Sequence, residues 1–360
     1  MAEIDELLLA AGELGASDVH LTASLPPKAR IHGELISLTE EALTVGRLSE
    51  LVLPILNEKS KAALDELGQT DFSYAIPGKG RYRVNVFRQR GSLAAVFRLV
   101  NALVPPAEKL GIPADVMDLV TRQRGLVLVT GPTGSGKSTT LAALIDRMNK
   151  ERNCHIVTLE DPIEYLHNHG TAIINQREIG TDSADYSGAL RAALREDPDV
   201  ILVGEMRDLD TIATAITAAE TGHLVLSTLH TTGAASTVDR IIDVFPEAQQ
   251  QQIRLQLSNV LEAVVSQLLL PNLRGNGRVA AFEVMFGTIA IRNLIREKKT
   301  HQINGLIQTG KRQGMQLMDD ALYDLYLKEK ISKDTAMAAA QDIESMQKRL
   351  FYASERSRFE

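Results

Sequence analysis

The sequence predicts an α/β domain with a mostly parallel sheet, preceded by a smaller α+β domain. From residue 114 onward, short apolar strand patterns alternate with helical patterns, which is typical of a parallel sheet with helices on both faces. In the first hundred residues, strand patterns follow one another across short turns, which favours an antiparallel sheet. A glycine-rich segment at 131–139 lies between a strand pattern and a helix pattern of the larger domain.

The smaller domain is expected over residues 1–100. Ile4, Leu8 and Ala11 recur at helical spacing and predict a helix over 3–14. Turn residues at 77–80 and 89–91 separate the last three strand patterns. Helical structure is expected over 45–67, and strands are expected over 17–22, 28–35, 69–76, 81–88 and 92–100.

The strand pattern at 81–88 alternates between apolar and polar residues. Its period of two places Tyr82, Val84 and Val86 on the core face and turns Arg81 and Arg83 outward. Arginines on such a face are usually solvated. Contact with an anion, such as nucleotide held by a neighbouring subunit, is the alternative, and the sequence leaves both open.

A proline-rich segment separates the two domains. Residues 101–113 contain three prolines and predict a linker that permits limited reorientation. The larger domain is expected over 114–360. Its strands are expected at 125–130, 155–160, 200–205, 224–230 and 278–286, and its helices at 137–150, 184–196, 209–221, 234–243, 247–267 and beyond 288.

The segment 131–139 matches the phosphate-binding pattern G-x-x-x-x-G-K-[ST] in full. Its glycines permit backbone conformations that direct N–H groups at a phosphate, at the positive end of a helix dipole. Lys137 is expected to reach the β- and γ-phosphates and Ser138 to ligate Mg²⁺. The alternative is a glycine-rich turn that matches by chance. The predicted nucleotide-binding residues are Gly131, Pro132, Thr133, Gly134, Ser135, Gly136, Lys137, Ser138 and Thr139.

Three further polar clusters follow predicted strands, and ligands of parallel sheets sit at the carboxyl ends of strands. Glu160, Asp161 and Glu164 follow the strand at 155–160. Glu205 ends an apolar strand in a Walker B arrangement, with Glu where Asp is usual, and its carboxylate suits Mg²⁺. His230 ends the next strand and is placed to contact a γ-phosphate.

Each cluster also has a purely structural explanation. Glu160 suits a turn or a helix cap, and Glu205 suits an exposed surface. His223 is expected to be a structural histidine. His167 and His169 are expected in a solvated loop rather than at a metal site. The functional interpretation therefore depends on all the clusters meeting at one edge of the sheet.

Composition indicates a cytosolic protein without membrane spans. The chain is 44% hydrophobic and 24% charged, with a net charge of −7, and no apolar run reaches the roughly 18 residues of a membrane helix. The acidic N-terminus lacks the basic start of a secretory signal. Cys154, the single cysteine, excludes an internal disulfide and a cysteine-cluster zinc site. The acidic balance argues against nonspecific nucleic-acid binding.

Together the motifs resemble those of the secretion-type hexameric ATPases, and the similarity covers nearly the whole chain. GPTGSGKSTT at 131–140 is similar to the family's Walker A segment, and TLEDPIE at 158–164 to its aspartate box. LREDPDVILVGEMRD at 194–208 is similar to its atypical Walker B segment, and TGHLVLSTLHT at 221–231 to its histidine box.

Two features favour the pilus retraction branch of that family. AIRNLIRE at 290–297 is similar to the signature of the branch. On a helix Ile291 and Ile295 share one face, and Arg292 and Arg296 share another, so an ordinary amphipathic helix is the alternative. The second feature is an absence, because a single cysteine excludes the four-cysteine zinc insertion usual in assembly and secretion relatives.

The resemblance implies a RecA-like P-loop ATPase domain with a PAS-like N-terminal domain, assembled as a homo-hexameric ring. It implies hydrolysis of ATP with Mg²⁺ to power pilus retraction, and hence pilus disassembly and twitching motility. The implied partners are an inner-membrane pilus platform protein and a second retraction ATPase, with no nucleic acid. The implied location is cytoplasmic, peripheral at the inner face of the cytoplasmic membrane.

The resemblance also implies roles for the site residues. Glu164 is expected to orient and activate the attacking water and Glu205 to support the Mg²⁺ shell, and the two roles remain exchangeable. His230 is expected to sense the γ-phosphate. Arg81 and Arg83 are expected to reach nucleotide across a subunit interface, with Arg98 as a third candidate.

Departures from the family pattern are small. Lys298 and Lys299 follow the signature where relatives often have a glycine, and the polar tail 351–360 is expected to be disordered.

Two other classes of function remain as alternatives. One is a regulatory subunit that binds ATP without hydrolysing it, against which the complete set of Glu164, Glu205 and His230 speaks. The other is a nucleic-acid motor, since RecA-like sheets also drive helicases. The acidic balance speaks against that alternative.

Overall fold

The computed structural model describes residues 3–31, 33–100 and 104–356, and the chain divides into two compact units. The first unit comprises Met1–Leu103 and Pro162–Leu166, and the second comprises Val104–Asp161 and His167–Glu360. Residues 101–103 of the expected linker lie outside the described residues. Val104, Ala107 and Leu110, from the rest of that segment, pack against the core of the second unit. The predicted domain boundaries stay a prediction.

The first unit contains a six-stranded antiparallel sheet in the order β3-β2-β1-β6-β5-β4. Helices pack against it around a core that includes Leu8, Leu48 and Phe97. Its strands are β1 (Asp18–Thr22), β2 (Lys28–Ile31), β3 (Glu34–Ser37), β4 (Gln69–Ile76), β5 (Gly80–Gln89) and β6 (Ser92–Val100). Its helices are α1 (Glu3–Glu13), α2 (Val45–Val52), the 3-10 turn η1 (Leu53–Ile55) and α3 (Glu58–Leu67).

The alternation predicted for the strand at 81–88 is confirmed. Tyr82, Val84 and Val86 are 3%, 0% and 0% exposed, whereas Arg83 is exposed and Arg81 is half-buried. The single strand predicted over 28–35 is wrong. Gly33 adopts a φ of +91°, a left-handed conformation that turns the chain between β2 and β3.

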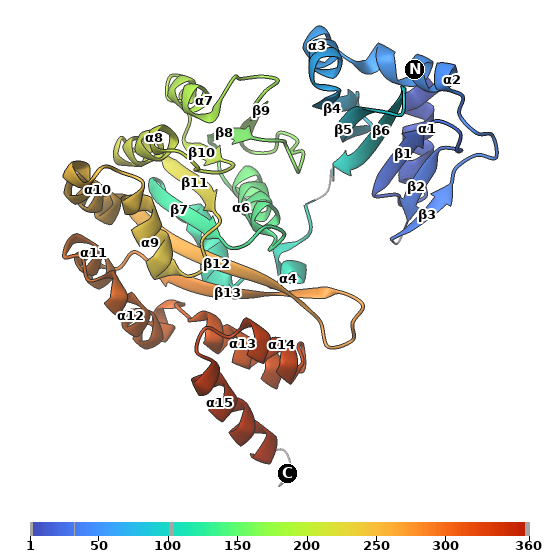
Figure 1. The fold of residues 1–360 in the computed structure, drawn as a ribbon. Helices are drawn as coiled ribbons and strands as arrows, with labels where there is room; N and C mark the ends of the chain where they lie inside the picture. The colour runs from blue at the N-terminus through green and yellow to red at the C-terminus, as the bar shows by residue number, and fades with distance from the viewer. Residues whose placement is uncertain (1–2, 32, 101–103, 357–360) are drawn as a thin grey trace. The chain divides into compact units, whose positions relative to one another are not determined.

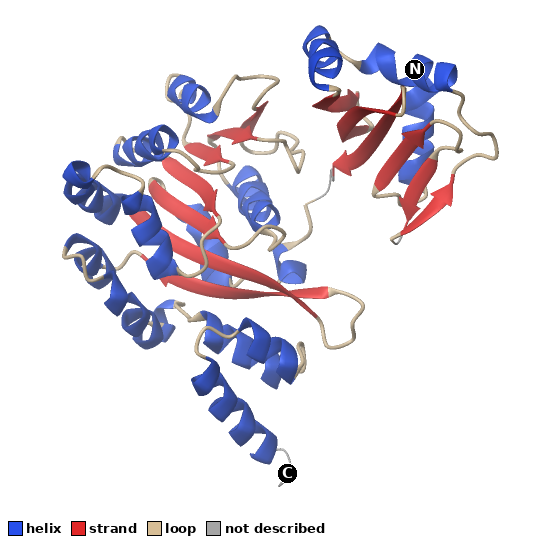
Figure 2. Ribbon diagram, viewed as in Figure 1, coloured by secondary structure: helices blue, strands red, loops and turns tan. Residues whose placement is uncertain are grey.

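The second unit is a seven-stranded sheet in the order β13-β12-β7-β11-β10-β8-β9 (Figure 1). Every neighbouring pair is parallel except β12 with β13, and helices lie on both faces (Figure 2). This architecture confirms the predicted α/β fold class. The strands are β7 (Gly125–Thr130), β8 (His155–Glu160), β9 (Ile173–Glu178), β10 (Val200–Val203), β11 (Leu224–Leu229), β12 (Leu261–Pro271) and β13 (Arg278–Phe286).

Short helices and turns connect and extend this sheet. Before β7 lie α4 (Ala107–Leu110), α5 (Ala114–Met117) and the 3-10 turn η2 (Asp118–Thr121). The helices between strands are α6 (Lys137–Glu151), α7 (Tyr186–Ala193), α8 (Leu209–Glu220), α9 (Ala234–Asp243) and α10 (Glu247–Val260). After the sheet follow α11 (Ile289–Arg296), η3 (Thr300–Gln302), α12 (Ile303–Thr309), η4 (Lys311–Gln313), α13 (Met318–Leu327), α14 (Lys333–Ala339) and α15 (Ile343–Arg356).

The helix predicted over 247–267 is wrong in its second half. Helix α10 ends at Val260, and residues 261–271 form β12 between β7 and β13. Ala263, Val264 and Val265 are each 0% exposed. A strand buried on both faces is a continuous apolar run, which periodicity cannot distinguish from a buried helix. Strand β9 was not predicted, because its sequence IINQRE lacks such a run.

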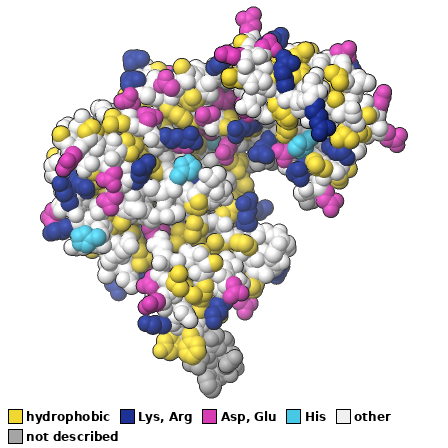
Figure 3. Space-filling model, in the orientation of Figure 1, with side chains coloured by type: hydrophobic (Ala, Val, Ile, Leu, Met, Phe, Trp, Pro, Cys, Tyr) yellow, Lys and Arg dark blue, Asp and Glu magenta, His cyan; other side chains and the backbone are white. Residues whose placement is uncertain are grey.

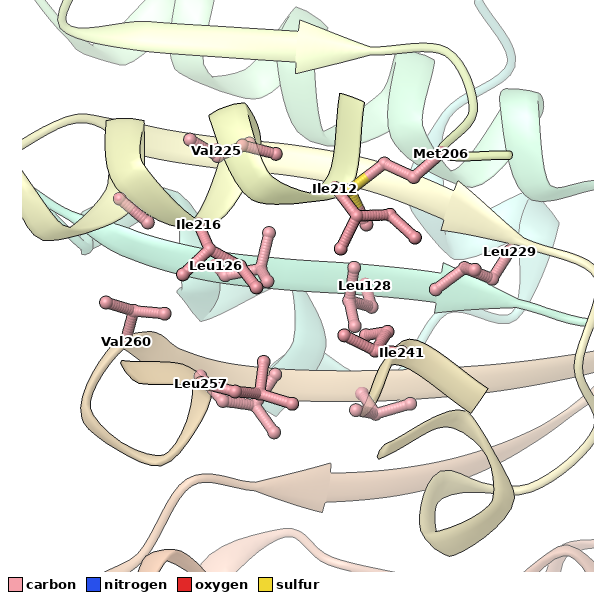
Figure 4. Packing of buried hydrophobic residues seen from close by; sticks show 14 of the residues in the cluster. Leu126, Leu128, Met206, Ile212, Ile216, Val225, Leu229, Ile241, Leu257 and Val260 are labelled. Carbon is pink, nitrogen blue, oxygen red and sulfur yellow. The ribbon is translucent and has the colours of Figure 1, made fainter. Parts of the chain in front are cut away.

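Strand β7 is the centre of the hydrophobic core. Its alternate residues belong to two hydrophobic clusters, one on each face of the sheet, because successive side chains of a strand point to opposite faces. Leu126 and Leu128 pack with residues of α8, α9 and α10 (Figure 4). Val127 and Val129 pack with residues of α6 on the other face. The residues that follow β7 therefore start from a fixed position.

The C-terminal segment is more regular than expected. Helix α15 runs through Arg356, so the predicted disorder of the tail is wrong over 351–356, and residues 357–360 lie outside the described part of the chain. Among the described helices, none combines the length and apolar character that crossing a bilayer requires.

Arg98, proposed to reach nucleotide, forms an ion pair with Asp18 in which its Nε lies 2.8 Å from the carboxylate. Burial alone would raise the pKa of the Asp18 carboxyl, but hydrogen bonds from Arg98 and Ser17 together lower that pKa below 3.8. A lowered carboxyl pKa adds stability above the unfolded-state value and loses it as the pH falls through the folded-state value.

We expect Asp18→Asn to lower the free energy of unfolding by about 1 kcal/mol at pH 7. The difference from the unmodified protein should shrink as the pH falls through the lowered folded-state pKa of Asp18, because below it the carboxyl is protonated in both states. Urea unfolding at pH 7 and at pH 2 measures the difference. Asp65→Asn, which removes the more exposed pair with Arg88, is the control and should change less. A loss at Asp18 that persists at pH 2 would contradict this account.

Candidate functional site

The predicted phosphate loop connects β7 to α6. Gly131, Gly134 and Gly136 have φ values of +140°, +79° and +90°, a region that favours glycine. Gly136 is the N-cap residue of α6, so the loop ends at the positive end of a helix dipole. These features are typical of a phosphate-binding loop.

Gln267 of β12 lies directly beneath the loop. A Cβ atom at Gly131 would lie 2.2 Å from the Gln267 carbonyl oxygen, and one at Gly136 would lie 2.9 Å from Gln267 Nε2. Both distances are shorter than a Cβ contact tolerates. Gly131 is therefore required by the backbone of a neighbouring strand as well as by its own φ angle, and a side chain at Gly136 would displace the Gln267 amide.

The polar side chains of the loop suit an anion. Lys137 is 9% exposed, and its Nζ donates to the carbonyl oxygens of Gly131 at 2.8 Å and Pro132 at 3.1 Å. Within the described structure, the buried hydroxyls of Thr130 and Ser135 make no hydrogen bond. Unpaired buried donors beside a buried ammonium fit a polyanionic ligand.

Parallel pairing brings the other clusters to the same edge. Strands β7, β11, β10 and β8 are consecutive neighbours, with Thr130 opposite Leu229, and Val203 opposite both Ser227 and Leu159. The phosphate loop follows β7. His230 follows β11, and Glu205 comes two residues after β10.

Glu205 and His230 are brought together. His230 Nε2 lies 3.4 Å from one carboxylate oxygen of Glu205, and Arg207 Nε lies 2.7 Å from the other. The Glu205 side chain is 15% exposed and that of His230 is 49% exposed. The carboxylate is thus oriented from both sides while the imidazole remains accessible.

Tyr186 of α7 closes the space beside Glu205. A Cβ atom at Gly204 would lie 2.9 Å from the Tyr186 hydroxyl and 3.1 Å from the Leu159 carbonyl oxygen, so glycine is required there. Burial raises the pKa of Tyr186, and the nearby carboxylates of Glu205 and Asp161 raise it further. The phenol therefore stays protonated and can donate a hydrogen bond.

Side chains of β11 fix the segment that carries Glu205. Ser227 Oγ donates to the Val203 carbonyl at 2.7 Å, and Thr228 Oγ1 donates to the Gly204 carbonyl at 2.6 Å.

The predicted structural role of His223 agrees with its contacts, because its Nδ1 lies 2.9 Å from the carbonyl of Ala218 in α8.

The carboxylates after β8 are less closely associated with the site. Glu160 is half-buried and accepts hydrogen bonds from Thr158 at 2.7 Å and Gln176 at 3.1 Å. Glu164 is exposed and lies in the segment Pro162–Leu166, which belongs to the first unit. The proposed water-activating role of Glu164 stays a prediction, as do those of Arg81 and Arg83 in the first unit.

The signature helix α11 has one face in the core. Ile291 and Ile295 are each 0% exposed, as their helical spacing predicts. Arg292 donates to the carbonyl oxygen of Ser258 at 3.1 Å and to Glu262 Oε1 at 2.6 Å. Because Ser258 is near the end of α10, this arginine caps that helix. Part of the signature is therefore structural.

Among the described residues, no group of three or more His, Cys, Asp or Glu side chains is arranged to hold a metal ion. Mg²⁺ in nucleotide sites commonly takes one or two protein oxygens, with phosphates and waters as the other ligands. The half-buried Ser138 hydroxyl at the start of α6 and the Glu205 carboxylate are suitable oxygens.

Several residues of this region were missed from sequence. Gln267 and Ser266 were assigned to a helix, and Tyr186 belongs to no motif. Glu283 of β13 is 1% exposed and accepts hydrogen bonds from Ala234 N at 2.6 Å and Met318 N at 3.2 Å. A polar residue inside an apolar strand pattern is the one signal that would have marked Gln267 and Glu283.

Comparison with known proteins agrees with this geometry. Residues 90–357 match the family described as type II/IV secretion system protein. The chain is 49% identical over 339 residues to the type IV pilus retraction ATPase PilT of Pseudomonas aeruginosa, covering 94% of this chain and 98% of the relative. It is 47% identical to a twitching motility protein of Neisseria gonorrhoeae, covering 89% and 86%.

A solved structure agrees as well. The crystal structure of the pilus retraction motor PilT with bound ADP superposes with a TM-score of 0.89 at 49% identity, covering 97% of this chain and 99% of that one. The resemblance predicted from the motifs is confirmed. The chain belongs to the type II/IV secretion system protein family and, within it, to the pilus retraction ATPases.

Proposed function

We propose that this chain is an Mg²⁺-dependent ATPase that acts as a homo-hexameric motor for pilus retraction. One observation carries the proposal. A complete phosphate loop and the Glu205–His230 pair meet at one edge of the parallel sheet. The similarity to a type IV pilus retraction ATPase and to a twitching motility protein supports it.

The loop residues account for nucleotide binding. The N–H groups of 131–139 and the Lys137 ammonium are positioned to neutralise the β- and γ-phosphates. Ser138 and Glu205 are the residues that would hold Mg²⁺, which would offset phosphate charge during hydrolysis. His230 is half-exposed and lies beside Glu205. It would contact the γ-phosphate directly, and the presence of that contact would alter the position of the Glu205 carboxylate.

The water-activating residue is either Glu164 or Glu205. Glu205 is already engaged, with Arg207 Nε 2.7 Å from one carboxylate oxygen and His230 Nε2 3.4 Å from the other. This pairing favours Glu164 as the base and Glu205 as the support of the metal shell.

The assembly and location are part of the proposal. In a hexameric ring, Arg81 or Arg83 would stabilise transition-state charge at a neighbouring subunit, as arginine fingers do in other NTPases. Arg83 is exposed on β5, where it lies across from Ser73 on β4 and Arg98 on β6. The motor would act on a pilus platform protein at the cytoplasmic face of the inner membrane, alongside a second retraction ATPase.

Two alternatives are less well supported. A nonhydrolysing regulatory subunit would not need Glu205 to be oriented from two sides. A nucleic-acid motor would favour a basic groove, whereas acidic and basic side chains are interspersed on the face in Figure 3. Phosphate release by the purified chain, with and without DNA, distinguishes all three: a motor of this family needs no DNA for turnover.

Lys137→Ala and Glu205→Gln should each reduce steady-state phosphate release at least ~100-fold, because they remove transition-state contacts. Lys137→Ala should also weaken ADP binding, whereas Glu205→Gln should not. Lys328→Ala and Glu247→Gln, at exposed positions of α13's end and α10, are matched controls and should keep normal activity. Turnover within threefold of normal in both site variants would refute the assigned roles.

Arg83→Ala should reduce turnover while leaving ADP affinity unchanged, because the arginine would act across an interface. Mixing it with inactive Lys137→Ala subunits should restore part of the activity, since one mixed interface then has both groups intact. Arg88→Ala, on the same strand but paired with Asp65, is the control. If the mixture is no more active than each variant alone, Arg83 does not act at the nucleotide site of the neighbouring subunit.

A further inference from the structure

Strand β12 connects two loops of the nucleotide site. In the middle of this strand, Ser266 and Gln267 are consecutive and almost completely buried, at 1% and 3% exposed. Successive side chains of a strand point to opposite faces of the sheet. The two side chains therefore reach different neighbours from one rigid position between β7 and β13.

Gln267 holds the phosphate loop to the sheet and to α6. Its Nε2 donates to the Ser135 carbonyl oxygen at 2.7 Å, and its Oε1 accepts from the Thr140 hydroxyl at 2.7 Å. Ser135 lies within the loop and Thr140 in the first turn of α6. Both amide atoms are thus used, and the loop is fixed at its middle and just after its end.

Ser266 holds the histidine loop, residues 230–233, on the other face. Its Oγ accepts a hydrogen bond from Gly233 N at 2.9 Å. Glu283, directly opposite Ser266 in register, accepts from the next amide, Ala234 N, at 2.6 Å. The two amides that start α9 are therefore held by side chains of β12 and β13.

We propose that Ser266 and Gln267 are positioning residues that fix the histidine loop and the phosphate loop relative to each other. Gln267 fixes the phosphate loop, which contacts the β-phosphate that ADP and ATP share. Ser266 sets the loop whose His230 is placed to read the γ-phosphate. This inference rests on the proposed function, because it assigns the two loops to one nucleotide.

The two positions should have separable effects. Gln267→Met keeps the shape of the side chain but removes two buried hydrogen bonds, so the affinity for ADP should fall about tenfold. Ser266→Ala leaves the phosphate loop intact, so ADP affinity should change less than twofold. It should lower kcat and the affinity for a nonhydrolysable ATP analogue about tenfold.

Calorimetric titration with ADP and with the nonhydrolysable analogue, together with steady-state kcat and KM, tests the proposal on the full chain. Ser266→Thr keeps the hydroxyl and should rescue Ser266→Ala, and Thr140→Val should reproduce part of the Gln267→Met effect. Gln316→Met is the matched control, since it removes a glutamine hydrogen bond to the Phe282 carbonyl at 2.8 Å on β13. Thermal melting without nucleotide reports general destabilisation.

The outcomes separate this inference from the proposed function. If the unmodified chain fails to bind ADP, the proposed function fails. If it binds ADP and Gln267→Met and Ser266→Ala bind both nucleotides with normal affinity and turnover, the positioning roles are refuted. Equal losses for both variants and for Gln316→Met, in proportion to melting temperature, would show a purely structural role and also refute them.

Discussion

The whole site depends on the parallel alignment of four buried strands. Strands β7, β11, β10 and β8 pair in register, so the segments that follow them emerge at one edge. The core on both faces of β7 holds that strand rigidly. The phosphate loop follows β7 directly, so its position is fixed by the end of that strand. A shift of one residue in any of these pairs would move Glu205 or His230 away from the loop.

Polar contacts inside the sheet then refine this alignment. Hydroxyls of Ser227 and Thr228 hold the strand end before Glu205, and Arg207 and His230 orient its carboxylate. On the other side of β7, Gln267 holds the phosphate loop through hydrogen bonds with Ser135 and Thr140. Apolar packing fixes the positions of the strands, and a small number of buried hydrogen bonds fix the positions of the loops. Nucleotide hydrolysis depends on both kinds of contact, because the groups that contact the phosphates tolerate little displacement.

Sequence reasoning predicted the elements whose signal is local. The glycines and the lysine of the motif identified the phosphate loop. Short apolar runs identified most strands of the second unit. Sequence reasoning failed where a tertiary contact decides the structure. Residues 261–267 carry apolar side chains on both faces of β12, including the consecutive buried residues Ala263, Val264 and Val265, so no period separated strand from helix. Gln267 was consequently missed, since its partner Thr140 lies 127 positions away in the chain. The turn at Gly33 was missed because a single glycine breaks an otherwise regular pattern.

One proposed site role involves a second subunit. Arg81 or Arg83 of β5 is proposed to act at the nucleotide of a neighbouring subunit, which would tie hydrolysis to movement within the ring. Part of the α11 signature is occupied in capping α10 through Arg292. Ile289, the first residue of α11 and the residue before the signature, is 79% exposed, and packing within the chain does not explain it.

The central claim is that hydrolysis at this site retracts pili, and the most direct measurement is a count of surface pili on cells whose only copy carries Glu205→Gln. Cells carrying Glu247→Gln serve as the control. The account predicts an excess of pili and loss of twitching motility, because assembly continues without retraction. Cells without pili would show that the chain powers assembly, and would contradict the account.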